Sequence, residues 1–281
     1  MSAGATRVLV ISSRAGSLNA EAETTLRAAF ADYVIVEFDP KDDLAKRLSS
    51  KARIVVAGGD GTVEFMIRKF ADTPHPIGII PLGTFNNLAR ALKLPTELDK
   101  AIEVAREARG HAITLGRVNG RIFVEACAIG LFGETIALGD AAKDRAFGGL
   151  ADGLKQVIAA KRFDYQLTGN LEGSGSAMSL VFSNTASIGS GLPVSDTNPI
   201  HRYLEFSVQA GRTRSDIVSR AVASAVLGKH AEDGMGQVFN FTELAVKTKP
   251  RARVYADNFL VGWTPATVNA EQSALRVALP I

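Results

Sequence analysis

The sequence predicts two domains, an N-terminal Rossmann-like α/β domain with a parallel sheet and a C-terminal antiparallel β-sandwich. Up to about residue 110, short β-branched runs alternate with segments whose apolar residues recur at helical spacing. Beyond residue 110, strand-like runs follow one another and open with a hairpin signal. Apolar residues make up 46% of the 281-residue chain and charged residues 22%, as in globular proteins with a substantial core. We therefore expect domains at residues 1–110 and 111–281.

The first half contains four strand–helix steps. Strands are expected at 7–12, 33–38, 54–57 and 77–80. Helices are expected at 20–31 with Asn19 as its cap, at 42–48, at 63–70, at 88–92, and at 97–108 with Gly110 as its C-cap. In parallel sheets of this kind ligands bind at the carboxyl ends of the strands. The loops that begin at Ser12, Gly58 and Pro81 should therefore converge on one ligand.

The second half is expected to be mainly antiparallel. Two strands, 113–118 and 121–128, flank Asn119-Gly120, which is typical of a type I′ hairpin. Further strands are expected at 165–171, 177–182, 203–209, 238–247, 252–255, 259–263 and 274–279, with helices at 149–161 and 215–227. The sequence leaves open whether the last strand returns to the first domain.

The central motif is Gly58-Gly59-Asp60-Gly61-Thr62, between a buried strand and an amphipathic helix. Glycines let the backbone approach a ligand, and the free N–H groups of a helix start favour an anion, with Thr62 as the expected helix cap. Asp60 would repel a phosphate unless a hydrated Mg²⁺ lies between them or the carboxylate takes a proton from an attacking hydroxyl. The alternative is a plain strand–turn–helix joint.

A second motif, Pro81-Leu-Gly-Thr-Phe-Asn-Asn-Leu-Ala-Arg90, repeats the order strand, glycine turn, helix. Thr84 offers a hydroxyl, and Asn86 offers a donor and an acceptor, beside the phosphate loop. Arg90 is expected to face solvent.

Together the two motifs resemble the diacylglycerol kinase catalytic-domain family, which includes bacterial lipid kinases and sphingosine and ceramide kinases. The resemblance implies an ATP-binding α/β domain, a lipid-binding β-sandwich with the active site between them, and Mg²⁺-assisted phosphorylation of a lipid hydroxyl, with a diacylglycerol-like substrate and a place in phospholipid synthesis. It implies Asp257 and Asp60 as catalytic residues. The nucleotide-binding residues that it implies are Ser12, Arg14, Gly16, Gly58, Gly59, Asp60, Gly61, Thr62, Thr84 and Asn86.

The chain departs from the family pattern at four places. The first loop is Ser12-Ser-Arg-Ala-Gly16 instead of Asn-Pro-x-Ser/Ala-Gly, and Glu64-Phe65 replaces an Asn-Glu pair. The late Asp-Gly-Glu becomes Asp257-Asn258-Phe259, and an Asp-Gly tied to Mg²⁺ aligns with His201-Arg202. Losing one general base typically costs roughly 10²- to 10⁴-fold in rate. Two alternatives therefore stay open, a lipid- or nucleotide-binding protein without turnover and an NAD kinase, which shares the glycine loop.

The composition limits the possible partners and cellular location of the protein. A net charge of +3 with 29 acidic residues argues against nucleic acid and allows contact with an anionic membrane surface. The single cysteine, Cys127, excludes an internal disulfide and is expected to be a buried apolar group. We expect no secretory signal, no membrane span, and a cytoplasmic protein with peripheral contact at the inner membrane face as an open option. Helix 149–161, with Lys155, Lys161 and Arg162, is one candidate for that contact.

Overall fold

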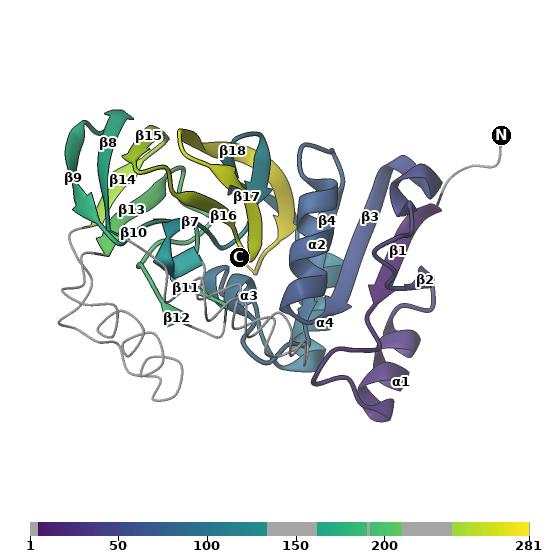
Figure 1. The fold of residues 1–281 in the computed structure, drawn as a ribbon. Helices are drawn as coiled ribbons and strands as arrows, with labels where there is room; N and C mark the ends of the chain where they lie inside the picture. Colours follow the sequence, from purple (N-terminus) through teal and green to yellow (C-terminus); the bar gives the residue numbers. More distant parts are fainter. Residues whose placement is uncertain (1–4, 134–161, 190–191, 210–237, 281) are drawn as a thin grey trace. The chain divides into compact units, whose positions relative to one another are not determined.

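The computed structural model describes residues 5–133, 162–189, 192–209 and 238–280. The chain divides into two compact units, Met1–Thr114 with Gln272–Ile281 (unit 1) and Leu115–Glu271 (unit 2). The predicted fold class is confirmed, because unit 1 holds a parallel sheet with helices and unit 2 holds antiparallel sheets (Figure 1). The helices expected at 149–161 and 215–227 lie outside the described residues.

The sheet of unit 1 has the strand order β2-β1-β3-β4-β18, and all its neighbours pair in parallel. Its strands are β1 (Ala5–Ile11), β2 (Val34–Glu37), β3 (Leu48–Gly58), β4 (Pro76–Pro81) and the end of β18 (Ala266–Ala278). The last strand does return to the first unit, since Arg276 and Val277 pair with Pro76 and Ile77. The carboxyl ends of β1, β3 and β4 therefore meet at one edge.

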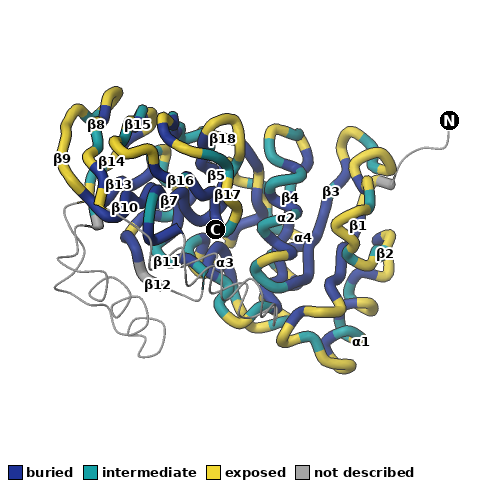
Figure 2. Tube along the Cα trace, in the orientation of Figure 1, coloured by how far each residue is buried: buried dark blue, intermediate teal, exposed yellow. Residues whose placement is uncertain are grey.

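Helices cover the faces of this sheet. They are α1 (Ala20–Ala29), α2 (Asp60–Phe70) and α4 (Leu98–Glu107), and the unit also contains the short helix α3 (Asn87–Ala91) and a 3-10 turn, η1 (Leu44–Arg47). Leu26 and Phe30 from α1 and Ile102 from α4 share one apolar cluster with residues of β1, β3 and β4. Helix α2 buries Val63, Met66, Ile67 and Phe70, the spacing expected from the sequence. Figure 2 shows the buried strands between these helices.

Two expected helix boundaries are wrong. The helix expected at 42–48 is only the single turn η1, because Leu44 is its buried residue and the following stretch extends as β3 from Leu48. Helix α2 begins at Asp60 with Gly59 as its N-cap, so Thr62 lies buried inside the first turn and is not the cap.

Gly110 is not a helix C-cap. Helix α4 ends at Glu107 with Ala108 as its C-cap, and Gly110 already begins β5 (Gly110–Val118). The carbonyls of Ala105 and Ala108 instead accept hydrogen bonds from the Arg53 guanidinium, at 2.7–3.1 Å. The Arg53 cation therefore satisfies carbonyls at the end of α4, the role that was expected of a glycine C-cap.

Unit 2 is built from two antiparallel sheets. One has the order β18-β15-β8-β9, with β5 paired to β18 and β6, and the other has the order β14-β13-β10-β7-β16-β17. The strands are β6 (Arg121–Phe123), β7 (Ala126–Gly130), β8 (Phe163–Gly169), β9 (Gly173–Ala177), β10 (Ser179–Ser183), β13 (Leu204–Gln209), β14 (Val238–Phe241), β15 (Glu243–Lys249), β16 (Arg253–Ala256) and β17 (Phe259–Trp263). A short pair, β11 (Ser187–Ile188) and β12 (Leu192–Pro193), stands apart. Both larger sheets contribute to one apolar core.

The chain changes sheets where single long strands were expected. The hairpin at Asn119-Gly120 is confirmed, with φ of 48° and 82°, but its second arm ends at Phe123, and β7 joins the other sheet. Likewise 238–247 divides at Thr242 into β14 and β15. There Asn170 Oδ1 accepts the backbone N–H groups of Thr242 and Glu243 at 2.8 and 2.7 Å. Side chains therefore satisfy the backbone where the ladder is interrupted.

Candidate functional site

Three loops of unit 1 meet at the carboxyl edge of its sheet. The N–H of Ser12 donates to the carbonyl of Ala57 at 3.0 Å, and the N–H of Leu82 donates to Gly58 at 2.9 Å. The N–H of Ser17 in turn donates to the carbonyl of Leu82 at 3.1 Å. These bonds confirm that the loops after β1, β3 and β4 converge, as a parallel sheet requires.

The start of helix α2 is open to an anion. Its N-cap, Gly59, makes no side-chain capping bond, and its carbonyl accepts the first helical bonds from Thr62 and Val63, both at 3.0 Å. The N–H groups of Asp60 and Gly61 come before those bonds in the helix. Gly61 is exposed, and a Cβ built there would meet nothing within 4 Å. The space beside Gly61 is therefore open, and the first-turn N–H groups and the helix dipole at this position suit a phosphate.

Asp60 ties the two sequence motifs together. Its Oδ1 accepts the N–H of Asn87, at the start of α3, at 3.0 Å. Its Oδ2 lies so close to Gly83 that a Cβ built on Gly83 would be 2.7 Å away. The carboxylate thus holds the second glycine turn against the first, and Gly83 must lack a side chain for this contact.

Asn86 braces the second loop internally. Its Oδ1 accepts the N–H of Gly83 at 2.9 Å and its Nδ2 donates to the carbonyl of Gly83 at 2.8 Å, while Asn86 itself has φ of 50°. Thr84 is exposed, and its hydroxyl would lie 3.6 Å from a Cβ on Gly16 of the first loop. Of these two polar residues, the Thr84 hydroxyl is therefore the one presented at the surface shared by the loops.

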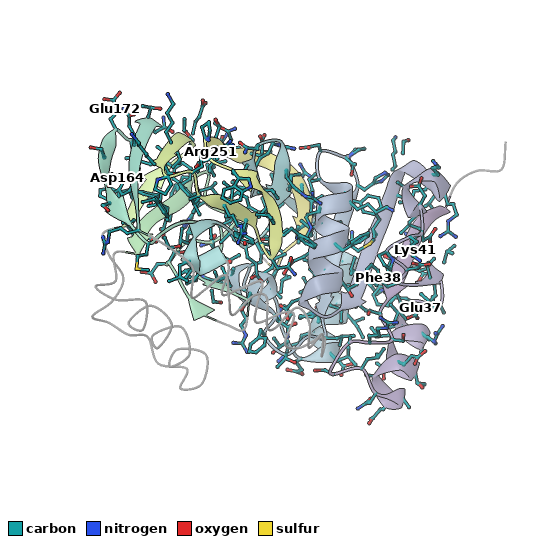
Figure 3. The ribbon with its side chains drawn as sticks, in the orientation of Figure 1. Glu37, Phe38, Lys41, Asp164, Glu172 and Arg251 are labelled. Carbon is teal, nitrogen blue, oxygen red and sulfur yellow. The ribbon has the colours of Figure 1, made fainter. Side chains whose placement is uncertain are left out.

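The first loop is held by an acidic side chain that the sequence reasoning did not single out. Glu37, at the end of β2, accepts the N–H of Ser13 at 2.9 Å, and Figure 3 labels it beside Phe38. Ser12 is buried, whereas Arg14 and Gly16 are exposed at the loop surface. The first loop thus presents one cation, Arg14, near the glycine turns.

The two residues that replace the family's Asn-Glu pair pack locally. Glu64 forms an ion pair with Arg68 at 3.1 Å, one turn along α2. The Phe65 ring makes an edge contact with Phe38 at 5.4 Å between centroids, and Lys69 lies 5.9 Å over it. The acidic side chain thus stands one position earlier than in the family, at Glu64, and position 65 makes an aromatic contact between α2 and Phe38, just after β2.

Asp257 lies in unit 2, in the two-residue turn between β16 and β17, with φ of 51°. It is buried, and its Oδ1 accepts the N–H groups of Val124, Glu125 and Ala126 at 3.1, 2.8 and 3.2 Å. Val124 also reaches Oδ2 at 3.0 Å. These amides belong to the point where the chain leaves β6 for β7, so Asp257 stabilises that change of sheet.

Sequence reasoning missed a second buried carboxylate beside Asp257. Glu125 is 5% exposed, and its Oε2 accepts the N–H of Gly189 at 2.7 Å. The sequence did carry a sign of it, because Glu125 is an acidic residue inside the otherwise apolar run Ile122–Ile129. A buried charge is costly unless it has hydrogen-bond or ionic partners. Unit 2 thus holds two carboxylates, Asp257 and Glu125, linked through the Glu125 N–H bond to Asp257.

The region around His201 holds further polar groups. Glu205 is largely buried on β13, and that burial raises the pKa of its carboxyl, while the N–H of Asp196 donates to its Oε2 at 3.3 Å. His201 stacks on Tyr203 and contacts Thr197 Oγ1 at 3.4 Å. Among the described residues, no group of three or more His, Cys, Asp or Glu side chains is arranged to hold a metal ion.

Comparison with known proteins finds a match to one protein family. Residues 10–118 match the diacylglycerol kinase catalytic domain. A diacylglycerol kinase from Staphylococcus carnosus is 40% identical over 83 residues, which is 29% of this chain and 27% of that relative. The matched part therefore spans about a quarter of that relative's length. The resemblance inferred from the two glycine motifs is thus confirmed for residues 10–118, the part of the chain that matches this domain.

Solved structures extend the likeness of the fold to the whole chain. The crystal structure of a diacylglycerol kinase from Bacillus anthracis superposes with a TM-score of 0.72 and 18% identity, and covers 98% of this chain and 97% of that one. An NAD kinase from Archaeoglobus fulgidus in complex with ATP superposes with a TM-score of 0.56 and 15% identity, and covers 96% and 92%. At these identities the likeness concerns the fold alone.

Proposed function

We propose that the protein is an ATP-dependent lipid kinase that transfers the γ-phosphate to a lipid hydroxyl, with a diacylglycerol-like acceptor. The observation that supports this most is the start of α2, where the first-turn amides of Asp60 and Gly61 lie beside the Asp60 carboxylate and a Cβ on Gly61 would meet nothing within 4 Å. The diacylglycerol kinase domain match over the same residues supports the lipid acceptor.

Nucleotide binding is proposed for the three converging loops. The amides of Gly58–Thr62 would hold phosphates, the Thr84 hydroxyl would donate to them, and Arg14 would offset their charge. Ser12, Gly16 and Asn86 would shape this surface through the backbone, since Asn86 already uses its amide on Gly83. Carried over from the family, this is the proposed ATP site.

Mg²⁺ fits the residues present at Asp60. Magnesium keeps several waters and is commonly held by one or two carboxylates together with substrate phosphates, so a cage of many protein ligands is unnecessary. Oδ1 of Asp60 is engaged by Asn87, which leaves Oδ2 as the atom facing Gly83 and the phosphate loop. Asp60 would hold the ion, whose positive charge would offset the repulsion between this carboxylate and the phosphates.

Activation of the lipid hydroxyl is proposed for Asp257, with Glu125 as the neighbouring carboxylate. A loose phosphoryl-transfer transition state demands little early removal of the acceptor proton. One carboxylate in place of the usual Asp-Gly-Glu pair is therefore compatible with a slow kinase. We place its work in the cytoplasm, with lipid reached at the inner membrane face.

The test is transfer of ³²P from γ-labelled ATP, with Mg²⁺, to diacylglycerol, monoacylglycerol, phosphatidylglycerol, sphingosine and ceramide in detergent micelles. A labelled lipid is expected, and Asp60→Asn should abolish its formation while Glu37→Gln, which alters only the first loop, should leave part of the activity. ATP binding without any labelled lipid would exclude the kinase.

A second candidate is a binding protein that retains the scaffold without turnover. It is favoured by one observation, that Asp257 already accepts three backbone N–H groups while Phe259 stands 44% exposed at the next motif position. This candidate predicts saturable ATP or lipid binding with no product. An NAD kinase is disfavoured by the Gly83-Thr84-x-Asn86-Asn87 motif, and labelled NADP in the same assay would reverse that judgement.

A further inference from the structure

Exposed apolar side chains concentrate on one edge strand of unit 2. Six large apolar side chains are exposed in the described part of the chain, and three of them lie on β17: Phe259 at 44%, Leu260 at 52% and Trp263 at 46%. The other three are far apart in the chain: Val34 on β2, Ile200 outside the helices and strands, and Val238 on β14. Strand β17 is the last strand of its sheet, paired only through β16. Such a cluster marks an interaction surface, whereas single exposed apolar residues do not.

Arginines accompany these side chains. The Arg121 guanidinium lies 5.8 Å from the centroid of the Phe259 ring, and the Arg253 guanidinium lies 5.3 Å from that of Trp263. Arg251, labelled in Figure 3, is exposed and donates to the carbonyl of Thr264 just beyond β17. Between residues 250 and 265 the sole acidic residue is Asp257, and it is buried. We call Phe259, Leu260 and Trp263, with Arg121 and Arg253, the β17 patch.

The geometry disfavours a protein strand as the partner of this edge. The pairing of β17 with β16 shifts register between Val254 and Tyr255, and Gly262 has φ of 137°. A bulge and a twist of this kind break the regular row of N–H and C=O groups that a further strand would need. Another strand, including one from a second copy of the chain, would pair poorly here.

The two faces of β17 also disfavour a single flat partner. Leu260 and Trp263 pair with Tyr255 and Arg253, whereas Phe259 pairs with Ala256, and residues one step apart point to opposite faces. Apolar groups therefore project on both sides of the strand. A soft apolar medium can accept both faces, while a rigid protein surface covers one.

We propose that the β17 patch docks the protein onto the surface of an anionic lipid membrane. Tryptophan and phenylalanine settle at the interface between headgroups and acyl chains, because their rings are apolar and tolerate a polar boundary. Arginines beside the rings attract anionic headgroups. Each cation near the surface strengthens the affinity for the membrane about fivefold. The choice of a lipid partner rests on the proposed lipid kinase function, but the docking itself requires no catalysis.

The chain carries its own reporter, because Trp263 is its single tryptophan. The full-length protein is mixed with phosphatidylcholine vesicles containing 30% phosphatidylglycerol, or none, and Trp263 emission is recorded. With the anionic vesicles the emission should shift to the blue and be quenched by lipids brominated on the acyl chain, and added salt should weaken the binding. Bound protein with unshifted, unquenched emission would overturn the proposal, as would absence of binding to anionic vesicles.

Two pairs of variants separate the patch from net charge. Arg121→Gln/Arg253→Gln should weaken vesicle binding roughly 25-fold, from about fivefold for each cation. Lys41→Gln/Lys51→Gln removes the same charge from exposed sites of unit 1 and should change binding by less than about threefold. Equal losses in both pairs would show a general charge effect and overturn the assignment. Leu260→Asn should weaken binding at every salt concentration, and Ile200→Asn, at an equally exposed apolar site, should not.

The kinase proposal fails separately from the docking proposal. Phosphorylation of a short-chain diacylglycerol dispersed without membranes should be unchanged in Arg121→Gln/Arg253→Gln. Blue-shifted Trp263 emission together with no phosphoryl transfer to any lipid would leave the docking surface standing and remove the kinase. Phosphoryl transfer to a lipid without a blue shift of Trp263 emission would support the kinase and overturn the docking surface.

Discussion

Replacing Gly61 by Ala separates ligand binding from folding in the phosphate loop. Gly61 is the second residue of α2, and a Cβ added there meets nothing within 4 Å. Alanine in a helix is more stable than glycine by roughly 0.5–1 kcal/mol, so the melting temperature should rise by about 1–4 °C. The added methyl group would, however, stand where a phosphate approaches the amides of Asp60 and Gly61. Losing one hydrogen bond to a charged phosphate costs about 1.5–3 kcal/mol, or roughly 10- to 100-fold in Kd.

The assay is titration of the variant with Mg·ATP by calorimetry, beside a thermal melt. Gly173→Ala is the matched control, because its added Cβ also meets open space, on β9 in unit 2. We expect Gly61→Ala to be at least as stable as the parent and to bind ATP at least tenfold more weakly, and Gly173→Ala to bind normally. Unchanged ATP affinity in a folded Gly61→Ala protein would refute the assignment of the α2 start as the phosphate site.

Three further outcomes are expected. Arg53→Met should lower the free energy of unfolding by about 1–3 kcal/mol in urea titration, because the carbonyls of Ala105 and Ala108 lose their donor, and no measurable loss would contradict that capping role. Burial raises the pKa of Glu205, so its ionised form opposes folding as pH rises above the ordinary glutamate range. Glu205→Gln should therefore have a higher melting temperature than the parent at pH 8 and the same melting temperature at pH 4. The exposed Glu172→Gln should show no such difference. Complete burial raises the pKa of the Cys127 thiol far above its usual range, so a thiol reagent should label the protein at pH 8 only after denaturation, and rapid labelling of folded protein would contradict this.

The strand, glycine turn and helix around Gly58–Thr62 were predictable because their signals are local. A β-branched run, three glycines and an apolar face of helical spacing define strand, turn and helix within one stretch of chain, and the convergence of three loops then follows from parallel topology. The same locality made the type I′ turn at Asn119-Gly120 predictable, since it needs two residues that tolerate positive φ.

Contacts between distant segments were not predictable in this way. The end of α4 was assigned to Gly110, but Arg53, more than fifty residues earlier, takes the carbonyls of Ala105 and Ala108. The strand breaks at Thr242 and after Phe123 depend on Asn170 and Asp257, whose side chains bond to backbone far away in sequence. Strand-forming residues continue through both breaks, so the local sequence pattern alone could not reveal them.

Asp257 shows why a motif residue can be located but not assigned from sequence. Its position between two expected strands was evident, yet its partners, the amides of Val124, Glu125 and Ala126, lie about 130 residues earlier. Those bonds make the carboxylate part of the β6-to-β7 crossing whether or not it also serves a substrate. Asp257→Asn keeps an oxygen acceptor for these amides and removes the charge, so it should fold and lose phosphoryl transfer if Asp257 is the base. Asp257→Ala removes both the acceptor and the charge. If this variant alone lost activity, the cause would be disruption of the backbone between β6 and β7, and not loss of a catalytic base.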